Sequence, residues 1–386
     1  MQTSDPGRFF ETDAEQATRA RRAAKSSNKY GNPIALKSKI LAAIVNPHSP
    51  RNEIFVALST GFVQKVNVDD GTSKTYRGPS TPVTSVAVGG PGNTTIFAGS
   101  WDKDIWSWDI STGTVGTKYV GHSDFVKAVV CARVGGKDIL ISGGADKKIL
   151  VWDVATGKRL HTLTDPVVNM MAVQHLALDP TSTEDEVCFA SASSDPHLRY
   201  WKVRRDDWKP EDFAGKEVEK HETSVYRLAF DADTEANELW TASGDGTARC
   251  WSRSTGAGWV PGESLEHGGH VRAVALAERW VITAGRDEDI RVWDRANGKV
   301  HVVLGGHYDE VTDLVVLGSG REERLASVSV DGTVRTWPLD VAGLEKAVEE
   351  QKVVEGEKDE PKEESKEGLL TAEEEAELAE LMDDDE

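Results

Sequence analysis

Short apolar runs recur along this chain, and each is bounded by turn residues. The clearest example is residues 121–153, GHSDFVKAVVCARVGGKDILISGGADKKILVWD, which open with Gly-His and close with Trp-Asp. Two apolar runs lie between these ends, and the run before the closing Trp-Asp follows a Gly-Ala-Asp turn. Alternation at period two beside glycine and aspartate turns predicts short antiparallel strands. The chain is therefore predicted to consist of β-hairpins.

This pattern repeats with a fixed offset between a turn aspartate and a tryptophan. Asp146 precedes Trp152 by six residues, and a degenerate copy near the N-terminus has Thr60-Gly61 in its turn and Val66 at the tryptophan position. Successive turns lie roughly 42 to 50 residues apart, the length of one four-stranded propeller blade. The six complete pairs are Asp102 and Trp108, Asp146 and Trp152, Asp195 and Trp201, Asp245 and Trp251, Asp287 and Trp293, and Asp331 and Trp337.

Together these features resemble the WD40-repeat family. The resemblance covers about residues 34–340 and implies an all-β fold, a seven-bladed β-propeller. One blade cannot bury both of its faces, so the blades are expected to stack in a closed ring. In this family an N-terminal strand completes the last blade, and residues 34–36 are the candidate because the final repeat stops after Trp337. The residues that carry the resemblance, besides the fixed offset, are Gly121-His122, Gly306-His307, Trp108-Asp109, Trp152-Asp153 and Trp293-Asp294.

Composition limits the cellular compartment and the classes of partner that are expected. The net charge is −20, and residues 345–386 alone hold nineteen acids and five lysines. Phosphate attraction needs a basic surface, so no direct nucleic-acid partner is expected. No apolar run approaches the ~18 residues that cross a bilayer, and no membrane partner is expected. The cysteines Cys131, Cys188 and Cys250 lie singly in strand-like runs, which fits reduced thiols in the cytoplasm or the nucleus.

The charge distribution divides the chain into three regions. Residues 1–33 are predicted to be a flexible basic arm, in which residues 13–25 could form a helix. The propeller follows over residues 34–340. Residues 341–386 are predicted to be an acidic, mostly disordered tail with a short helix over residues 371–382, whose start has a capping-box pattern. The tail has two interpretations, a docking peptide or a solubilising segment.

Blade four is predicted to end in an insertion over residues 203–215. The segment is charged, contains Trp208 and Phe213, and is longer than a connection between blades requires. Long loops on rigid scaffolds often carry binding. A binding loop and simple variation within the family remain equal alternatives.

A histidine, a hydroxyl residue and an aspartate recur together and could be mistaken for a catalytic triad. An enzyme needs one activated nucleophile, whereas this set occurs in four blades, so a structural role is favoured. The resemblance implies that each set joins its tryptophan in a hydrogen-bonded tetrad. No catalytic, cofactor-binding or metal-binding residue is predicted, because phosphate-loop and metal-ligand spacings are missing. The tetrads are His122, Ser142, Asp146 and Trp152; His221, Thr241, Asp245 and Trp251; His267, Thr283, Asp287 and Trp293; and His307, Ser327, Asp331 and Trp337.

The resemblance also points to a binding face. Propellers of this family commonly bind peptides on the narrow top face, which is lined by residues at fixed offsets from the histidine and the aspartate. Those offsets select an aromatic and basic set on an otherwise acidic chain, which suits an acidic or phosphorylated segment of a partner. The aromatic and basic residues are Trp101, Phe125, Lys127, Tyr226, His270, Arg272 and Arg286, and the same offsets also give Ser224, Glu310 and Thr312.

The function predicted from these observations is a non-catalytic scaffold or adaptor that binds partner peptides on the top face. The alternative is a substrate-recognition or structural subunit of a larger assembly, such as a ubiquitin ligase or a chromatin-modifying, RNA-processing or ribosome-assembly complex. Basic proteins are further candidate partners, because the acidic tail would attract them.

Overall fold

The structure is a computed structural model that describes residues 13–165, 170–211, 221–231, 238–254 and 258–359. The chain divides into two compact units, residues 1–348 and residues 349–386. The first unit holds the β-structure and is described first.

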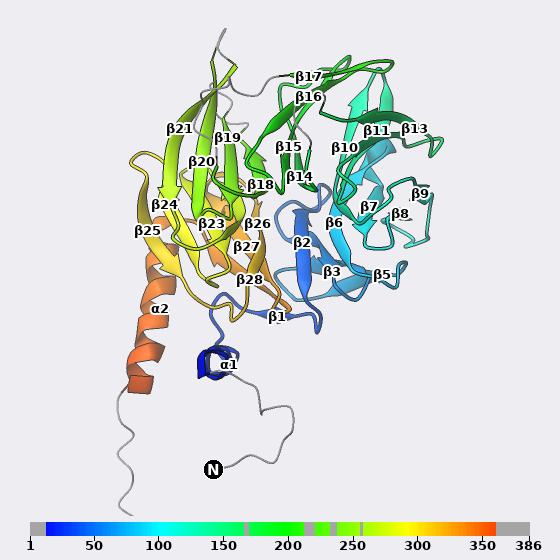
Figure 1. Ribbon diagram of the computed structural model, residues 1–386. Coiled ribbons are helices and arrows are strands. Elements are labelled where there is room, and N and C mark those ends of the chain that lie inside the picture. Colours follow the sequence, from blue (N-terminus) through cyan, green and yellow to red (C-terminus); the bar gives the residue numbers. More distant parts are fainter. Residues whose placement is uncertain (1–12, 166–169, 212–220, 232–237, 255–257, 360–386) are drawn as a thin grey trace, which may run out of the picture. The chain divides into compact units, whose positions relative to one another are not determined.

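Seven four-stranded antiparallel sheets form the blades of a propeller, which confirms the predicted fold (Figure 1). In blades one to six the four strands follow one another in the sequence. The strands are, in blade one, β2(Ile40–Val45), β3(Glu53–Leu58), β4(Val63–Asn67) and β5(Ser73–Tyr76); in blade two, β6(Val83–Gly89), β7(Thr95–Ser100), β8(Asp104–Asp109) and β9(Tyr119–Val120); in blade three, β10(Val126–Val134), β11(Lys137–Gly144), β12(Ile149–Asp153) and β13(Arg159–Leu163); in blade four, β14(Val173–Leu178), β15(Val187–Ser193), β16(Arg199–Val203) and β17(Trp208–Glu211); in blade five, β18(Val225–Phe230), β19(Leu239–Ser243), β20(Thr247–Ser254) and β21(Gly258–Glu266); and in blade six, β22(Val271–Leu276), β23(Trp280–Gly285), β24(Ile290–Asp294) and β25(Lys299–Leu304).

Blade seven is completed from the other end of the chain. It contains β26(Val311–Leu317), β27(Arg324–Ser329) and β28(Thr333–Pro338), and its outer strand is β1(Ile34–Ala35). Ile34 pairs with Val334 in antiparallel register. This pairing closes the ring as the family resemblance implies, and it covers an edge that would otherwise expose unpaired backbone groups.

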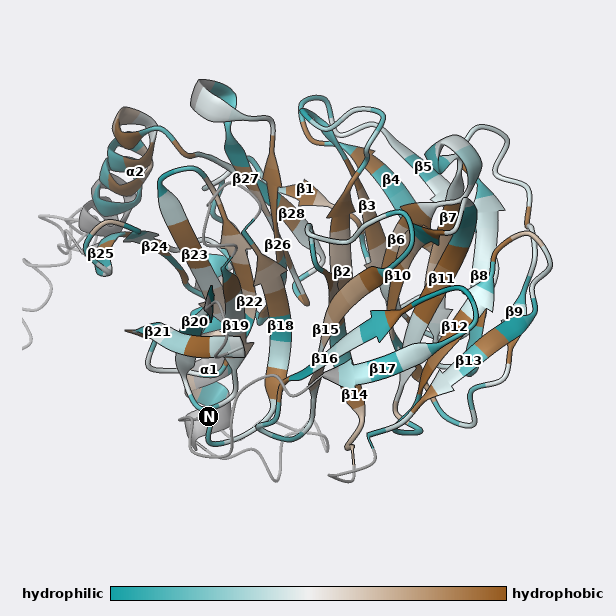
Figure 2. Ribbon diagram, turned by 90° about the horizontal axis from the view of Figure 1, so that it is seen from above, coloured by the Kyte–Doolittle hydropathy of each residue, from teal (hydrophilic) through white to brown (hydrophobic). Residues whose placement is uncertain are grey.

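The core of the propeller lies between the blades. Seven clusters of buried apolar side chains each combine residues of two neighbouring blades, so every blade interface has its own cluster. Figure 2 shows hydrophobic residues along the strands and hydrophilic residues in many of the connecting loops. The alternation in the sequence therefore packs each blade on both faces, as the ring requires.

The described part of the N-terminal arm contains a helix and a segment that is bonded to the propeller. Residues 1–12 lie outside the described part, but α1(Asp13–Lys25) forms the helix that its composition favours, and the segment after it is anchored to blade seven. Thr336 donates a backbone hydrogen bond of 2.7 Å to the carbonyl oxygen of Gly31. The side chain of Asn28 donates to the carbonyl oxygen of Gly306 at 2.8 Å. Residues 28–33 are therefore bonded to blade seven, and backbone pairing continues outward from β1.

The start of the predicted tail differs from its prediction. Residues 341–359 form a helix, α2(Val341–Asp359), where disorder was expected. Within the first unit, Leu344 is buried in the cluster between blades six and seven, and Val341 and Val348 pack against it. These apolar positions recur at helical spacing on one face, a signal that the acidic composition concealed.

In the second unit the structure describes residues 349–359, which continue α2. The predicted helix over residues 371–382 lies outside the described residues. None of the described helices is long and apolar enough to cross a membrane.

The predicted insertion of blade four is in part a strand. Residues 208–211 form β17, the outer strand of blade four, in which Trp201 pairs with Pro210. A proline is tolerated there because an outer strand needs to bond only one neighbour. The proline and the charged residues concealed this strand, and Phe213 lies outside the described residues.

Candidate functional site

The predicted tetrads of blades three, five and seven are brought together in the structure. In blade seven, His307 Nδ1 lies 2.8 Å from Asp331 Oδ2 and His307 Nε2 lies 2.8 Å from Ser327 Oγ. The Trp337 indole donates to the same hydroxyl at 3.0 Å. The tetrads of His122 and His221 have the same arrangement: Nδ1 faces the aspartate, Nε2 faces the hydroxyl, and the tryptophan indole donates to that hydroxyl. Such buried polar chains leave no member unsatisfied and hold the strands of a blade in one register.

In blade six the two ring nitrogens of the histidine have exchanged their partners. His267 Nδ1 lies 2.8 Å from Thr283 Oγ1, and Nε2 faces Asp287 at 3.1 Å. The guanidinium of Arg291 lies 2.7 Å from this Nε2 and 2.6 Å from Asp287. Because arginine can only donate, Nε2 must accept from it, and the imidazole proton is left on Nδ1. Arg291 thus explains the different orientation of the ring.

Blades two and four have no histidine in the tetrad, yet their aspartates are bonded. The Trp106 indole donates to Asp102 at 2.8 Å. In blade four, Arg199 donates to Asp195 at 3.1 Å and to Asp165 at 2.7 Å. Other donors therefore occupy the place of the histidine in these turns.

The blade-seven tetrad makes stability depend on pH. Burial lowers the pKa of His307, so the folded state holds the neutral ring, and this contribution is lost as pH falls below the ordinary pKa of about 6.5. Burial alone would raise the pKa of Asp331, but hydrogen bonds from His307 and Thr333 lower it, so its contribution is lost below about pH 4. We expect the urea midpoint to be level from pH 8 to 7, to fall below pH 6.5, and to fall further below pH 4. A midpoint that stayed level down to pH 5 would contradict this assignment.

A β-bulge near the start of every inner strand shapes the centre of the propeller. In blade three the register shifts between Val126 and Ala128, which leaves Lys127 unpaired, and the same shift occurs in the other six blades. A bulge re-aims the side chain of its extra residue. The seven bulged residues all line one central cavity, and we call them the bulge ring: Leu41, Thr84, Lys127, Gln174, Tyr226, Arg272 and Thr312.

The cavity has a volume of about 490 Å³ and lies along the inner strands. Four of the predicted partner-binding residues line it, namely Trp101, Lys127, Tyr226 and Arg272. Trp101 belongs to an aspartate turn, so the mouth of the cavity lies on the face that carries these turns, which is the predicted top face.

The two basic residues of the bulge ring lie close enough for the charge of one to change the pKa of the other. Burial and the charge of Arg272 lower the pKa of Lys127. The Lys127 ammonium donates to the Gln174 amide oxygen at 3.0 Å, and no carboxylate among the described residues forms an ion pair with it. The Arg272 guanidinium lies 4.2 Å from the Tyr226 ring centroid and 2.9 Å from Glu310. An anionic group at the mouth would relieve the repulsion between the two cations.

A buried ion pair lies deeper in the cavity. Arg227 of blade five bonds Asp313 of blade seven at 2.8 Å, and the Asp313 side chain is 1% exposed. Asp313 also accepts the backbone N–H of Ala43 at 3.0 Å. Burial raises the pKa of Asp313 and lowers that of the neighbouring His175 well below its ordinary value. This pair joins blades five, seven and one across the channel.

The remaining predicted residues divide into two groups. Phe125 stacks on Trp101 with ring centroids 4.9 Å apart, although 36% and 43% of these side chains stay exposed. His270 and Arg286 are exposed neighbours, joined by a backbone hydrogen bond of 3.1 Å, and they are not among the residues that line the cavity. The structure thus gathers five of the seven residues at one mouth.

Sequence reasoning missed Leu41, Thr84 and Gln174 as members of the site. The signal was present, because each bulged residue directly follows the valine or isoleucine that opens an inner strand. The bulge itself depends on pairing with the next strand and cannot be read from one strand alone.

The described residues contain no group of three or more histidine, cysteine or acidic side chains arranged to hold a metal ion. The histidine–hydroxyl pairs are buried in their blades, where no substrate could reach the hydroxyl. What the arrangement offers is an aromatic and basic surface around a polar cavity, which suits binding.

Comparison with known proteins gives the same family at several positions. The family described as WD domain, G-beta repeat, matches residues 71–109, 113–153, 261–294 and 298–338. An uncharacterized WD repeat-containing protein of Schizosaccharomyces pombe is 33% identical over 399 aligned positions, which cover 100% of both chains.

Two other relatives match over shorter stretches. A ribosome biogenesis protein of Candida glabrata is 28% identical over 28% of this chain and 27% of its own length. A small ribosomal subunit protein of Oryza sativa subsp. japonica is 30% identical over 43% of this chain and 46% of its own.

Proposed function

The chain belongs to the WD40-repeat family, and we propose that it is a non-catalytic adaptor that binds a partner polypeptide on its top face. One observation carries the proposal: the bulge ring and the stacked pair Trp101–Phe125 meet at a single mouth. Solvent-exposed aromatic faces beside arginine are the composition of binding hot spots.

The charges at the mouth favour an acidic or phosphorylated segment of the partner. Lys127 has an amide rather than a carboxylate as its partner, whereas Arg272 stacks on an aromatic face and pairs with Glu310. An extended acidic segment could stack on Trp101 and direct one anionic group between these two cations, where charge-assisted hydrogen bonds are strong. We place this interaction in the cytoplasm or the nucleus.

A second candidate is a recognition or structural subunit of a larger assembly. The names of two relatives refer to ribosome biogenesis and to the small ribosomal subunit. Basic proteins of such an assembly would be attracted to the acidic residues 345–386.

Affinity purification with mass spectrometry tests the adaptor proposal. We expect the amount of one defined partner recovered with Trp101→Ala/Lys127→Glu to be at least ten-fold lower than with the wild type, because stacking and charge are removed together. Arg286→Glu is the matched control, since it changes an exposed cation on a residue that does not line the cavity. Unchanged thermal midpoints would show that both variants are folded.

A chain that ends at Asp359 separates the two candidates. If only this truncation loses partners, the tail is the recognition element and the proposed top-face site is wrong. If the double variant keeps every partner that the wild type binds, the adaptor proposal fails at this mouth.

A further inference from the structure

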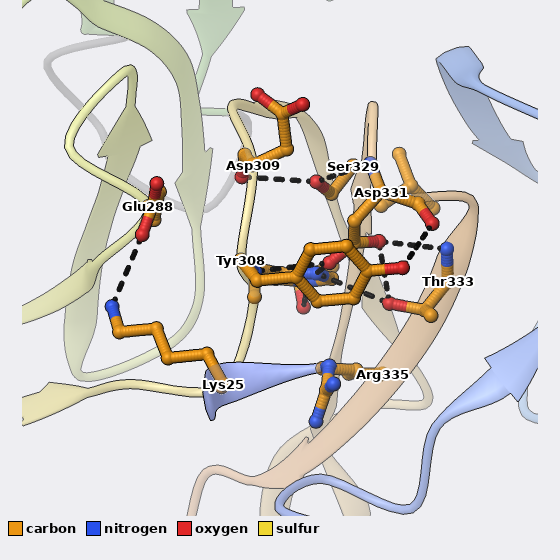
Figure 3. Close-up of polar contacts among 12 residues, drawn as sticks. Lys25, Glu288, Tyr308, Asp309, Ser329, Asp331, Thr333 and Arg335 are labelled. Atoms are coloured by element: carbon orange, nitrogen blue, oxygen red, sulfur yellow. Dashed lines mark hydrogen bonds and ion pairs between the residues drawn. The ribbon is translucent and has the colours of Figure 1, made fainter. Parts of the chain in front are cut away.

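The basic helix α1 lies on acidic residues of blades six and seven. Arg21 Nη2 lies 2.9 Å from Glu288 Oε1, and Lys25 Nζ lies 3.1 Å from Glu288 Oε2. Arg22 Nη2 reaches Asp309 at 2.9 Å. Figure 3 shows Lys25 directed toward Glu288, with Asp309 on the neighbouring loop. Positions 21 and 25 are one helical turn apart, so one carboxylate binds both.

Glu288 is unusual among the aspartate turns. It directly follows Asp287 and adopts φ +74°, a left-handed conformation that favours glycine. The other complete turns have Lys103, Lys147, Pro196, Gly246 and Gly332 at this position, and both lysines are exposed. Only blade six places an acid there, and its side chain is 1% exposed beneath α1. A carboxylate buried this far requires cationic partners.

Asp309 is held in place by the blade-seven turn. Its own carbonyl oxygen accepts the Ser329 hydroxyl at 3.0 Å, and its carboxylate accepts the backbone N–H of Glu310 at 2.8 Å. Figure 3 shows this bond from Ser329 beside the tetrad aspartate. The acidic surface is therefore preformed on two rigid turns.

The helix contributes charge and little else to the contact. Among the α1 side chains whose burial is described, Ala17, Ala20 and Ala23 are exposed, while Arg22 and Lys25 are half-buried. None of these described α1 side chains belongs to the apolar cluster between blades six and seven, which Tyr30 joins from the following segment. Ion pairs made by such partly exposed cations are weak and sensitive to salt, whereas the anchor that begins at Asn28 does not involve these cations.

Asp289 lies beside Glu288, with its carboxylate 4.0 Å from Lys25 Nζ. We propose that Glu288, Asp289 and Asp309 form a second docking surface, which takes basic helices, and that α1 is its exchangeable occupant. A partner that presents two adjacent arginines and a lysine one turn later competes with α1 for this surface. The surface lies in the turns and loops of blades six and seven and does not depend on the cavity at the centre of the ring.

Fluorescence anisotropy on the full chain tests this proposal with a labelled peptide of residues 13–27. In the wild type, α1 occupies the surface and the peptide binds weakly. In Arg21→Glu/Arg22→Glu/Lys25→Glu, α1 is repelled, and we expect the Kd of the peptide to be at least ten-fold lower at 50 mM salt. Raising the salt to 300 mM should remove this gain.

Glu288→Lys, added to that variant, should return the peptide to wild-type affinity. The substitution is compatible with the backbone, because Lys103 and Lys147 adopt φ +76° and +66° in the equivalent turns. Lys147→Glu on the same background is the matched control and should leave the Kd unchanged. Equal peptide affinity in the wild type and the charge-reversed helix, or no effect of Glu288→Lys, would overturn the proposal.

Discussion

Replacing Asp331 by alanine is expected to destabilise the protein by about 3–5 kcal/mol, the range for breaking a buried charged network. Its side chain is 0% exposed. It accepts from His307 Nδ1, from the backbone N–H of Tyr308 at 3.2 Å, and from both the backbone N–H and the hydroxyl of Thr333 at 2.8 and 2.7 Å. Alanine would leave these donors in a space that water fills poorly, so most of their desolvation cost would remain.

Urea unfolding followed by tryptophan fluorescence measures this loss. Asp102→Ala is the matched control, because Asp102 occupies the same turn of blade two without a histidine and is 24% exposed. We expect Asp102→Ala to cost about 1 kcal/mol. Equal losses of unfolding free energy at the two positions would mean that the tetrad adds no stability beyond that of the turn itself.

Deleting residues 1–39 is expected to lower the unfolding midpoint sharply. The free energy of unfolding should fall by at least about 4 kcal/mol. The deletion removes β1 and so exposes the edge of β28. It also removes Asn28 and Tyr30, which bond the guanidinium of Arg335, a side chain that is 1% exposed. The charge of Arg335 would then be left without these acceptors.

Deletion of residues 1–25 is the control for this effect. It removes α1 and keeps the anchor and β1. We expect a change below about 1 kcal/mol, because the cations of α1 are 32–55% exposed and Glu288 is no longer covered once α1 is gone. An unchanged midpoint after the longer deletion would contradict the closure of blade seven by β1.

The ring of blades could be predicted because its signal is local and repeated. Each aspartate–tryptophan offset lies within one hairpin, and the family resemblance implied which residues lie next to Ser142 or Thr241 in the folded blade. Six such offsets and one degenerate copy carried the resemblance to the WD40-repeat family, and that resemblance implied the seven-bladed fold.

Features that depend on distant partners could not be predicted in this way. The helix over residues 13–25 follows from its composition, but its contact with Glu288 depends on a turn of blade six that lies far away in the sequence. Lys127 and Arg272 were found by offset, whereas their approach across the channel results from ring curvature. Strand β17 was concealed because Pro210 argues against a strand unless its outer position is known.

The pairing of Ile34 with Val334 also determines the order in which the molecule can be assembled. During synthesis β1 emerges about 300 residues before its partner, a delay of roughly 15 to 60 s at typical elongation rates. Blades one to six can each form from contiguous residues as they leave the ribosome, but the seventh cannot be completed until nearly the whole chain exists. Throughout that interval the face of blade one that will contact blade seven, including Ile54 and Val56, has no covering partner. The nascent chain therefore carries an uncovered apolar face on blade one, which must be kept from other chains until blade seven covers it.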